Sequence, residues 1–164
     1  MRILGLDPGS RKTGVGIIEA SGDRLRMIHY TVIQAGGGAF TERLGLIFNG
    51  VRDLVAEFQP LEAAVETVFV AHNAASAIKL GQARGAAMCA LIDAGLPVAE
   101  YSPRSVKQAI VGRGAADKVQ VQHMVRVLLG LSESPPEDAA DALAVALCHH
   151  HTSGTLARMS ALQK

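Results

Sequence analysis

The order in which hydrophobic periodicities follow one another constrains the fold more than any other feature of this sequence. Residues 2–6, 13–19 and 25–33 are short apolar or alternating segments, and they predict three strands. Residues 41–58 instead repeat apolar side chains every three or four positions, which predicts an amphipathic helix that Pro60 stops. Three consecutive strands joined by short polar turns indicate an antiparallel meander.

The rest of the chain alternates between strands and helices. Residues 63–69 and 97–101 predict two further strands, separated by a helix from about Asn73, a plausible cap, to residue 94. Three more helices are expected at residues 102–111, 117–129 and from near 137 to about 150. Since no repeat or linker interrupts this order, residues 1–164 are predicted to form one α/β domain. It would contain a mixed sheet with helices on its faces, and a polar tail after about residue 152.

Composition and hydropathy exclude several classes of protein. Hydrophobic residues make up 49% of the chain, which excludes a disordered protein. The longest apolar runs fall short of the roughly 18 residues of a membrane span, and the N-terminus is too short in apolar residues for a signal peptide. The two cysteines, Cys89 and Cys148, lie in apolar helical contexts and are expected to be buried thiols. These features predict a soluble cytoplasmic protein.

Charge is distributed unevenly along the chain. The formal net charge is only +1, but residues 101–130 contain five cations and one anion. Such a basic segment is compatible with contact to phosphate groups, and equally with an ordinary solvated surface. Charge alone leaves both interpretations open.

Four carboxylates stand in positions that need an explanation. Asp7 ends the first strand, and Glu66 interrupts a buried strand, where a carboxylate is costly without a partner. Asp138 and Asp141 are three residues apart near the start of a helix. They therefore share one face, next to the positive end of the helix dipole.

Oxygen ligands from several separate elements suit Mg²⁺ or Mn²⁺. Two such ions can activate a water and stabilise the leaving oxygen of a phosphodiester, so that no side-chain nucleophile is needed. The same four acids could instead be a turn residue, a salt-bridged strand residue and two acids of a first helical turn. The residues alone leave these alternatives open.

Four segments carry a resemblance to a known family. Residues 5–16, 65–85, 106–125 and 138–144 resemble, in this order, segments of the RuvC family, the Holliday-junction resolvases. The first segment alone is weak, because Asp-x-Gly hairpins occur throughout the wider ribonuclease H-like group. The four together span nearly the whole chain and are specific.

The resemblance implies a ribonuclease H-like fold, with a five-stranded mixed sheet and helices on both faces. It also implies a Mg²⁺-dependent endonuclease, with Mn²⁺ as a substitute, that acts as a homodimer on four-way DNA junctions in recombination and repair. Each subunit would nick one of two opposing strands and leave 5′-phosphate and 3′-hydroxyl ends. The implied partners are the branch-migration proteins RuvA and RuvB.

Position by position, the resemblance assigns roles to individual residues. The metal-binding acids are matched by Asp7, Glu66, Asp138 and Asp141. Lys107 and Lys118 match catalytic basic residues close to the cut phosphate, and Phe69 matches an aromatic residue that stacks on a base near the junction centre. The remaining expected DNA contacts are Asn73, Lys79, Arg84 and Arg113. One departure is His72, which stands where relatives often have lysine. This difference leaves open how strongly the loop binds DNA at neutral pH.

Three other classes of protein are alternatives to this one. The YqgF type, linked to ribosomal RNA processing, shares the first segment, but residues 79–85 and 138–143 argue against it. A sugar-kinase or actin-like protein needs two large lobes, for which 164 residues are too few. A junction-binding dimer with no cutting activity is opposed by the complete set of four acids.

Overall fold

The computed structural model describes residues 1–22, 24–67 and 73–161, and only the backbone of residues 155–161. Five strands form one sheet in the order β3-β2-β1-β4-β5. Their bounds are β1 (Arg2–Asp7), β2 (Lys12–Ser21), β3 (Arg24–Gln34), β4 (Glu62–Glu66) and β5 (Val98–Tyr101). The described helices are α1 (Phe40–Phe58), α2 (Ala74–Asp93), α3 (Pro103–Val111), α4 (Lys118–Leu128) and α5 (Glu137–Ala161). The predicted antiparallel meander β1-β2-β3 is confirmed, and β1, β4 and β5 are parallel, which makes the sheet mixed.

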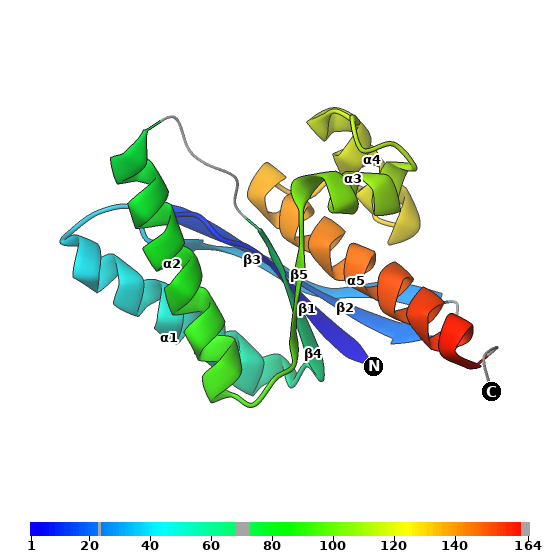
Figure 1. Cartoon of the computed structure of the whole chain (residues 1–164), viewed down its shortest axis with the longest axis horizontal. Helices are drawn as coiled ribbons and strands as arrows, with labels where there is room; N and C mark the ends of the chain where they lie inside the picture. The colour runs from blue at the N-terminus through cyan, green and yellow to red at the C-terminus, as the bar shows by residue number, and fades with distance from the viewer. Residues whose placement is uncertain (23, 68–72, 162–164) are drawn as a thin grey trace.

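Strand side chains alternate between the two faces of the sheet, and each face has its own helices. Leu4, Leu6 and other side chains of the same face pack against α1 and α2. Ile3, Ile18 and Ala64 belong to the opposite core, which α3, α4 and α5 complete. Figure 1 shows these two layers on either side of the strands. The prediction of a five-stranded α/β sheet with helices on both faces is therefore confirmed.

The expected helix starts are confirmed by their caps. The side chains of Asn73, Ser102 and Asp117 each accept a hydrogen bond from the backbone N–H three residues on, at 2.8, 3.0 and 2.8 Å. Each cap satisfies an N–H group that the first helical turn leaves without a partner.

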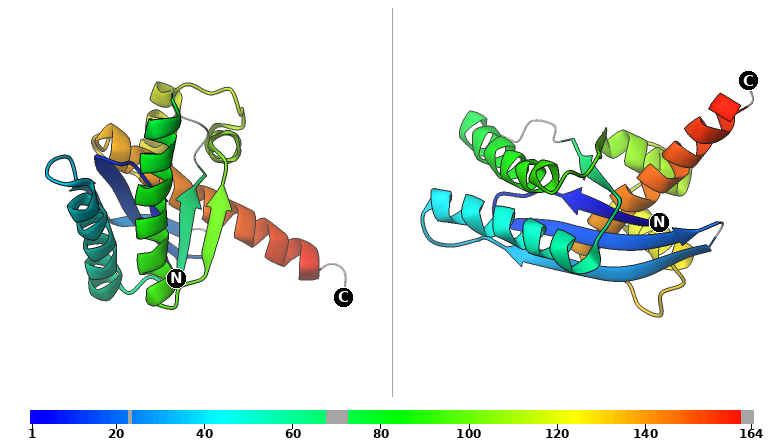
Figure 2. Two further views of the ribbon diagram at one scale, coloured as in Figure 1. Left: turned by 60° about the vertical axis from the view of Figure 1, so that its left-hand side comes forward. Right: turned by 90° about the horizontal axis from the view of Figure 1, so that it is seen from below.

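The end of the last helix differs from expectation. Instead of stopping near His150, α5 continues to Ala161 and extends past the strands, as Figure 2 shows. Polar residues were expected to end the helix, but here they bond to the preceding turn: the Thr152 hydroxyl donates to the Cys148 carbonyl at 2.8 Å. A threonine hydroxyl that donates to the carbonyl four residues earlier can be accommodated within a continuing helix.

The fourth strand is also shorter than expected. It ends at Glu66 rather than at residue 69, although Thr67 still donates its N–H to the Tyr101 carbonyl at 2.8 Å. Phe69 and His72 fall in residues 68–72, outside the described residues, so the base-stacking role of Phe69 stays a prediction.

The two cysteines differ from each other. Cys148 is buried as predicted, at 1% exposure. Cys89 is exposed, so that prediction is wrong: α2 packs through Ala83, Ala87 and Ala90, and Cys89 lies off this line. Among the described segments, no helix is both long and apolar enough to cross a membrane.

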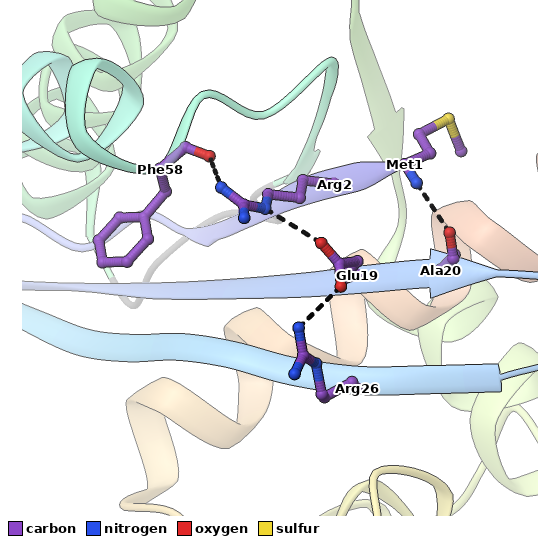
Figure 3. Close-up of polar contacts among 6 residues, drawn as sticks. All are labelled: Met1, Arg2, Glu19, Ala20, Arg26 and Phe58. Carbon is purple, nitrogen blue, oxygen red and sulfur yellow. Dashed lines mark hydrogen bonds and ion pairs between the residues drawn. The ribbon is translucent and has the colours of Figure 1, made fainter.

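The start of β1 is fixed by a set of polar contacts (Figure 3). Glu19 accepts from Arg2 at 3.3 Å and from Arg26 at 2.9 Å, which joins the three meander strands. Arg2 also donates to the Phe58 carbonyl at 2.7 Å, at the end of α1. The hydrogen bonds from Arg26 and Arg2 lower the pKa of Glu19. This network holds one end of β1, and Asp7 lies at the other end.

Helix α5 lies unusually close to the sheet because three strand residues that face it are glycines. A Cβ atom at Gly14 would lie 1.9 Å from the Asp138 carbonyl oxygen, and one at Gly5 would lie 2.2 Å from that of Ala142. At Gly16 the added atom would meet the Leu143 side chain at 2.7 Å. Glycine inside a strand marks such close approach. The contact sets the distance between the sheet and the acids of α5.

Candidate active site

Asp7 and Glu66 lie side by side at the ends of two parallel strands. In the register of β1 and β4, Leu6 is opposite Val65, so the next residue of each strand is an acid. Strand alternation places the neighbours Leu6 and Val65 in the core under α1 and α2, and therefore turns both acids to the α5 face. The carboxyl ends of parallel strands are where α/β proteins commonly build their sites.

The first turns of α5 bring the other two acids to this place. Asp141 lines the same cavity as Asp7 and Glu66, whereas Asp138, one turn earlier, does not line it. The Asp138 carboxylate lies 4.0 Å from the Lys12 ammonium group, and its charge contributes to the raised pKa of Asp7. The predicted shared face of Asp138 and Asp141 is consistent with this arrangement, although the two acids have different neighbours.

The cavity has a volume of about 240 Å³ and combines acids, lysines and an apolar wall. Its charged lining consists of Asp7, Glu66, Asp141, Lys107 and Lys118. Pro103, Val106, Val121 and Ala144 supply the apolar part. Five of the six residues predicted to be catalytic therefore meet in one place, from β1, β4, α3, α4 and α5.

Burial and mutual repulsion raise the pKa values of the acids in the cavity. Burial, and then the charges of Asp141 and Asp138, raise the pKa of Asp7 from 3.8 to about 7. Burial, and then the charges of Asp7 and Asp141, raise the pKa of Glu66 from 4.5 to about 7. Burial is also the main cause that raises the pKa of Asp141, and the charge of Lys118 opposes it. A cluster of this kind gains stability when a cation binds it.

The two lysines differ in their surroundings. Lys118 forms an ion pair with Glu137, and its ammonium group lies 3.9 Å from Asp141. The hydrogen bond to Glu137 raises the pKa of Lys118. Lys107, on α3, has no ion pair among the described residues, and its charge lowers the pKa of Glu66 and Asp141. A free ammonium group at the edge of an acidic cavity is available to a phosphate.

The other predicted DNA-binding residues have different surroundings. Asn73 caps α2. The Lys79 ammonium group lies 5.9 Å from the centre of the Phe40 ring, where a cation–π contact is favourable. Arg84 pairs with Glu100 and donates to the Glu66 carbonyl at 3.3 Å, which ties α2 to β4 and β5. Arg113 lies in the loop between α3 and α4. DNA contact by these residues stays a prediction.

Some residues of the site were missed from the sequence. Two of them are Glu137, which pairs with Lys118, and Lys12, which lies beside Asp138. These contacts join distant segments of the chain, so no local sequence pattern predicts them. The glycines of β1 and β2 did carry a signal, because glycine in a strand interior points to close packing.

A second polar network fixes α5 farther along its length. The Tyr101 hydroxyl lies 2.9 Å from His149 Nδ1, and His149 Nε2 lies 2.8 Å from a carboxylate oxygen of Glu62. The contacts join α5 to β5 and β4, the strand that carries Glu66. Together with the close approach of α5 to Gly5, Gly14 and Gly16, they hold the acids of α5 and of the sheet in one arrangement.

Comparison with known proteins agrees with this geometry. The family model "Crossover junction endodeoxyribonuclease RuvC" matches residues 3–149. The protein of that name from Teredinibacter turnerae is 52% identical, over 99% of this chain and 94% of its own length. The protein of the same name from Halorhodospira halophila is 56% identical, over 94% of this chain and 93% of its own length.

Among solved structures, Thermus thermophilus RuvC in complex with a Holliday junction substrate superposes with a TM-score of 0.88. It is 38% identical and covers 93% of this chain and 94% of the Thermus chain. The ribonuclease H-like fold expected from the resemblance is confirmed by this match. The chain belongs to the RuvC family of crossover junction endodeoxyribonucleases.

Proposed function

We propose that this protein resolves four-way (Holliday) DNA junctions by paired symmetric nicks, in homologous recombination and DNA repair. The observation that carries the proposal is the single cavity in which Asp7, Glu66 and Asp141 adjoin Lys107 and Lys118. Acidic oxygens for metal ions and cations for phosphate are the two requirements of metal-assisted phosphodiester hydrolysis. The Thermus relative, solved with a Holliday junction substrate, supports junction DNA as the substrate.

The proposed cofactor is Mg²⁺, for which Mn²⁺ would substitute. The donors fit, because the carboxyls of Asp7 and Glu66 face the cavity without a hydrogen bond or ion pair to any described residue. In the described part of the chain, no three acids, histidines or cysteines already form a metal cage. Mg²⁺ does not require one, since it keeps several waters and takes one or two carboxylates together with substrate phosphates.

Bound metal ions supply an activated water and stabilise the leaving 3′ oxygen, which gives 5′-phosphate and 3′-hydroxyl ends. The chain's own residues prepare the site for this chemistry. Asp7, Glu66 and Asp141 are the proposed ligands in the cavity, and Asp138, one helical turn before Asp141, is the fourth proposed ligand. Lys107 holds the cut phosphate, and Lys118 offsets charge on the side of α5.

The proposed DNA surface surrounds this cavity. Lys79 and Asn73 lie near the start of α2, and Arg113 follows α3. Phe69 is proposed from the resemblance alone to stack on a base at the junction centre. Arg84 is the weakest of these candidates, because its guanidinium is already paired with Glu100 and only one-fifth exposed.

Paired nicks on opposing strands need two cavities, and each chain has one of this kind. We therefore propose a homodimer, acting in the cytoplasm with the branch-migration proteins RuvA and RuvB. Exposed apolar residues on α2, such as Ile78 at 63% exposure, are available for contact with a second subunit.

The proposal is tested by gel shift and nicking on a synthetic four-way junction, with a linear duplex of equal length as the control. We expect tight binding of the junction and, with Mg²⁺, symmetric cuts in two opposing strands. Binding without any cut in the presence of Mg²⁺ would leave a junction-binding protein and end the enzyme proposal.

Lys107→Ala is expected to slow cutting by about 100-fold and to weaken junction binding by less than about threefold, because the ammonium group acts mainly on charge that develops at the cut phosphate. Single-turnover rates with protein in excess give the first number, and gel shifts without metal give the second. Lys79→Ala is the matched control, and it is expected to weaken junction binding more than it slows cutting. Equal losses of rate and affinity in Lys107→Ala would reduce Lys107 to a simple phosphate contact.

A further inference from the structure

A second cavity is lined in part by α3, and arginines dominate its lining. Its volume is about 460 Å³, and it is lined by Arg104, Arg113, Gly114 and Ala115. Both arginines are exposed, and neither guanidinium group has a hydrogen bond or ion pair within the described ranges of the chain. Other arginines have acidic partners: Arg2 and Arg26 pair with Glu19, and Arg84 pairs with Glu100.

The loop between α3 and α4 is folded so that the two arginines share this cavity. Gly112 turns the chain with φ 77°, and the Gln108 side chain donates to its carbonyl at 2.9 Å. The Ala116 N–H donates to the Arg113 carbonyl at 3.2 Å, which closes the next turn. A Cβ atom at Gly114 would lie 2.8 Å from Cγ of Arg104, so glycine leaves room for that side chain against the loop.

Two guanidinium groups around one cavity repel each other unless an anion lies between them. Among the residues that the structure describes, no acidic side chain lines the cavity. Asp117, four residues after Arg113, accepts the N–H of Gln120 at 2.8 Å and caps α4. Glu100, four residues before Arg104, is paired with Arg84. Arginine is suited to bind phosphate oxygens in pairs. The cavity is therefore complementary to a phosphate or a similar oxyanion.

Helix α3 relates this cavity to the acidic one. Arg104 and Lys107 are three residues apart, a spacing that makes them neighbours on a helix surface. Lys107 and Pro103, on either side of Arg104 in sequence, line the acidic cavity. We propose that Arg104 and Arg113 together bind one uncut backbone phosphate of the DNA strand whose neighbouring phosphate lies over the acids. This inference rests on the proposed function.

A double-mutant cycle tests whether both arginines bind one phosphate. Junction affinity of the wild type, Arg104→Gln, Arg113→Gln and the double variant is measured without metal at several salt concentrations. Each single variant is expected to bind about tenfold more weakly and to lower the slope of log K against log salt by about 0.9, the value for one phosphate. The double variant should lose little more than either single variant.

Arg52→Gln is the matched control, because it removes the same charge from α1 on the opposite face of the sheet; no change in slope is expected. Arg113→Lys keeps the charge but not the paired donors, so partial recovery of affinity is expected. Additive losses in the double variant, or an unchanged slope in the single variants, would overturn the shared site. Titration with inorganic phosphate at constant ionic strength should show no saturable binding. Saturable binding that Arg113→Gln abolishes would identify a small-anion site instead and overturn the proposal.

The outcomes separate this inference from the proposed function. A wild-type protein that neither binds nor cuts the junction would remove both. A wild-type protein that cuts normally, while Arg104→Gln and Arg113→Gln keep its affinity and salt slope, would remove only the arginine site.

Discussion

Asp7→Asn is expected to abolish junction cutting while junction binding is retained. One oxygen of the proposed ligand becomes a neutral amide nitrogen, which metal ions of this kind do not accept. Cutting should fall by at least about 1,000-fold, comparable to losing one preorganised charge-stabilising group in other enzymes. Single-turnover nicking with Mg²⁺ and gel shifts without metal measure the two properties separately. Full cutting activity would remove Asp7 from the site.

The same substitution should stabilise the metal-free protein. A carboxyl whose pKa rises on folding, from 3.8 to about 7 for Asp7, increasingly opposes folding as pH rises through this window. Above about pH 7 the penalty is constant, and Asp7→Asn should then raise the free energy of unfolding by roughly 2 kcal/mol. Near pH 4 most of this gain should vanish.

Urea unfolding in EDTA at pH 8 and pH 4 tests this effect. Asp53→Asn is the control, since Asp53 is an exposed residue of α1 paired with Arg52 and should show almost no change. Added Mg²⁺ should stabilise the wild type more than Asp7→Asn, because binding to the folded state alone adds stability. An Asp7→Asn protein less stable than the wild type at pH 8 would contradict the idea that the buried Asp7 carboxylate opposes folding.

Gly14→Ala is expected to damage both stability and cutting. Its Cβ atom would lie 1.9 Å from the Asp138 carbonyl oxygen, so the start of α5 must move away from the sheet. We expect a loss of about 3 kcal/mol in the free energy of unfolding, at the upper end for overpacking. Cutting should fall by about 100-fold even where the variant is fully folded, because a shift of about 1 Å in catalytic groups has effects of this size.

Gly45→Ala provides the matched control. Gly45 lies inside α1, and no atom of the described residues outside its own helical turn lies within 4 Å of an added Cβ. Alanine should therefore stabilise the helix by about 0.5–1 kcal/mol and leave cutting unchanged. Circular dichroism at the assay temperature establishes that Gly14→Ala is folded. A folded Gly14→Ala protein with wild-type cutting would show that the position of α5 does not limit the reaction.

Local features of the fold could be predicted from the sequence. The caps at Asn73, Ser102 and Asp117 involve partners three residues away, so their signals lie within one helical turn. The alternation of side chains between the two faces of the sheet, in β1 and β4, likewise depends only on neighbouring residues. That Asp7 and Glu66 lie side by side also needs the strand order, which residue pattern alone did not give. The resemblance assigned both acids to one site.

Features that depend on distant segments could not be predicted. Cys89 was expected to be buried, because its neighbours are apolar, but the side of α2 that faces the sheet is set by the alanines. Arg84 was expected to contact DNA, and its pairing with Glu100 depends on the position of β5. The different surroundings of Asp138 and Asp141 depend on Lys12 and Lys118, from two other elements.

The close contact between α5 and the sheet also restricts where the chain can change in length. The contact places Ala142 over Gly5 and Leu143 against Gly16, and His149 bonds to Tyr101 and Glu62 farther along the helix. One residue inserted between Asp141 and Ala142 would rotate the two acids by about 100° around the helix axis relative to these contacts. The same insertion after Thr152 would leave them in place. Insertions and deletions should therefore be tolerated beyond Thr152 and rejected in the first three turns of α5.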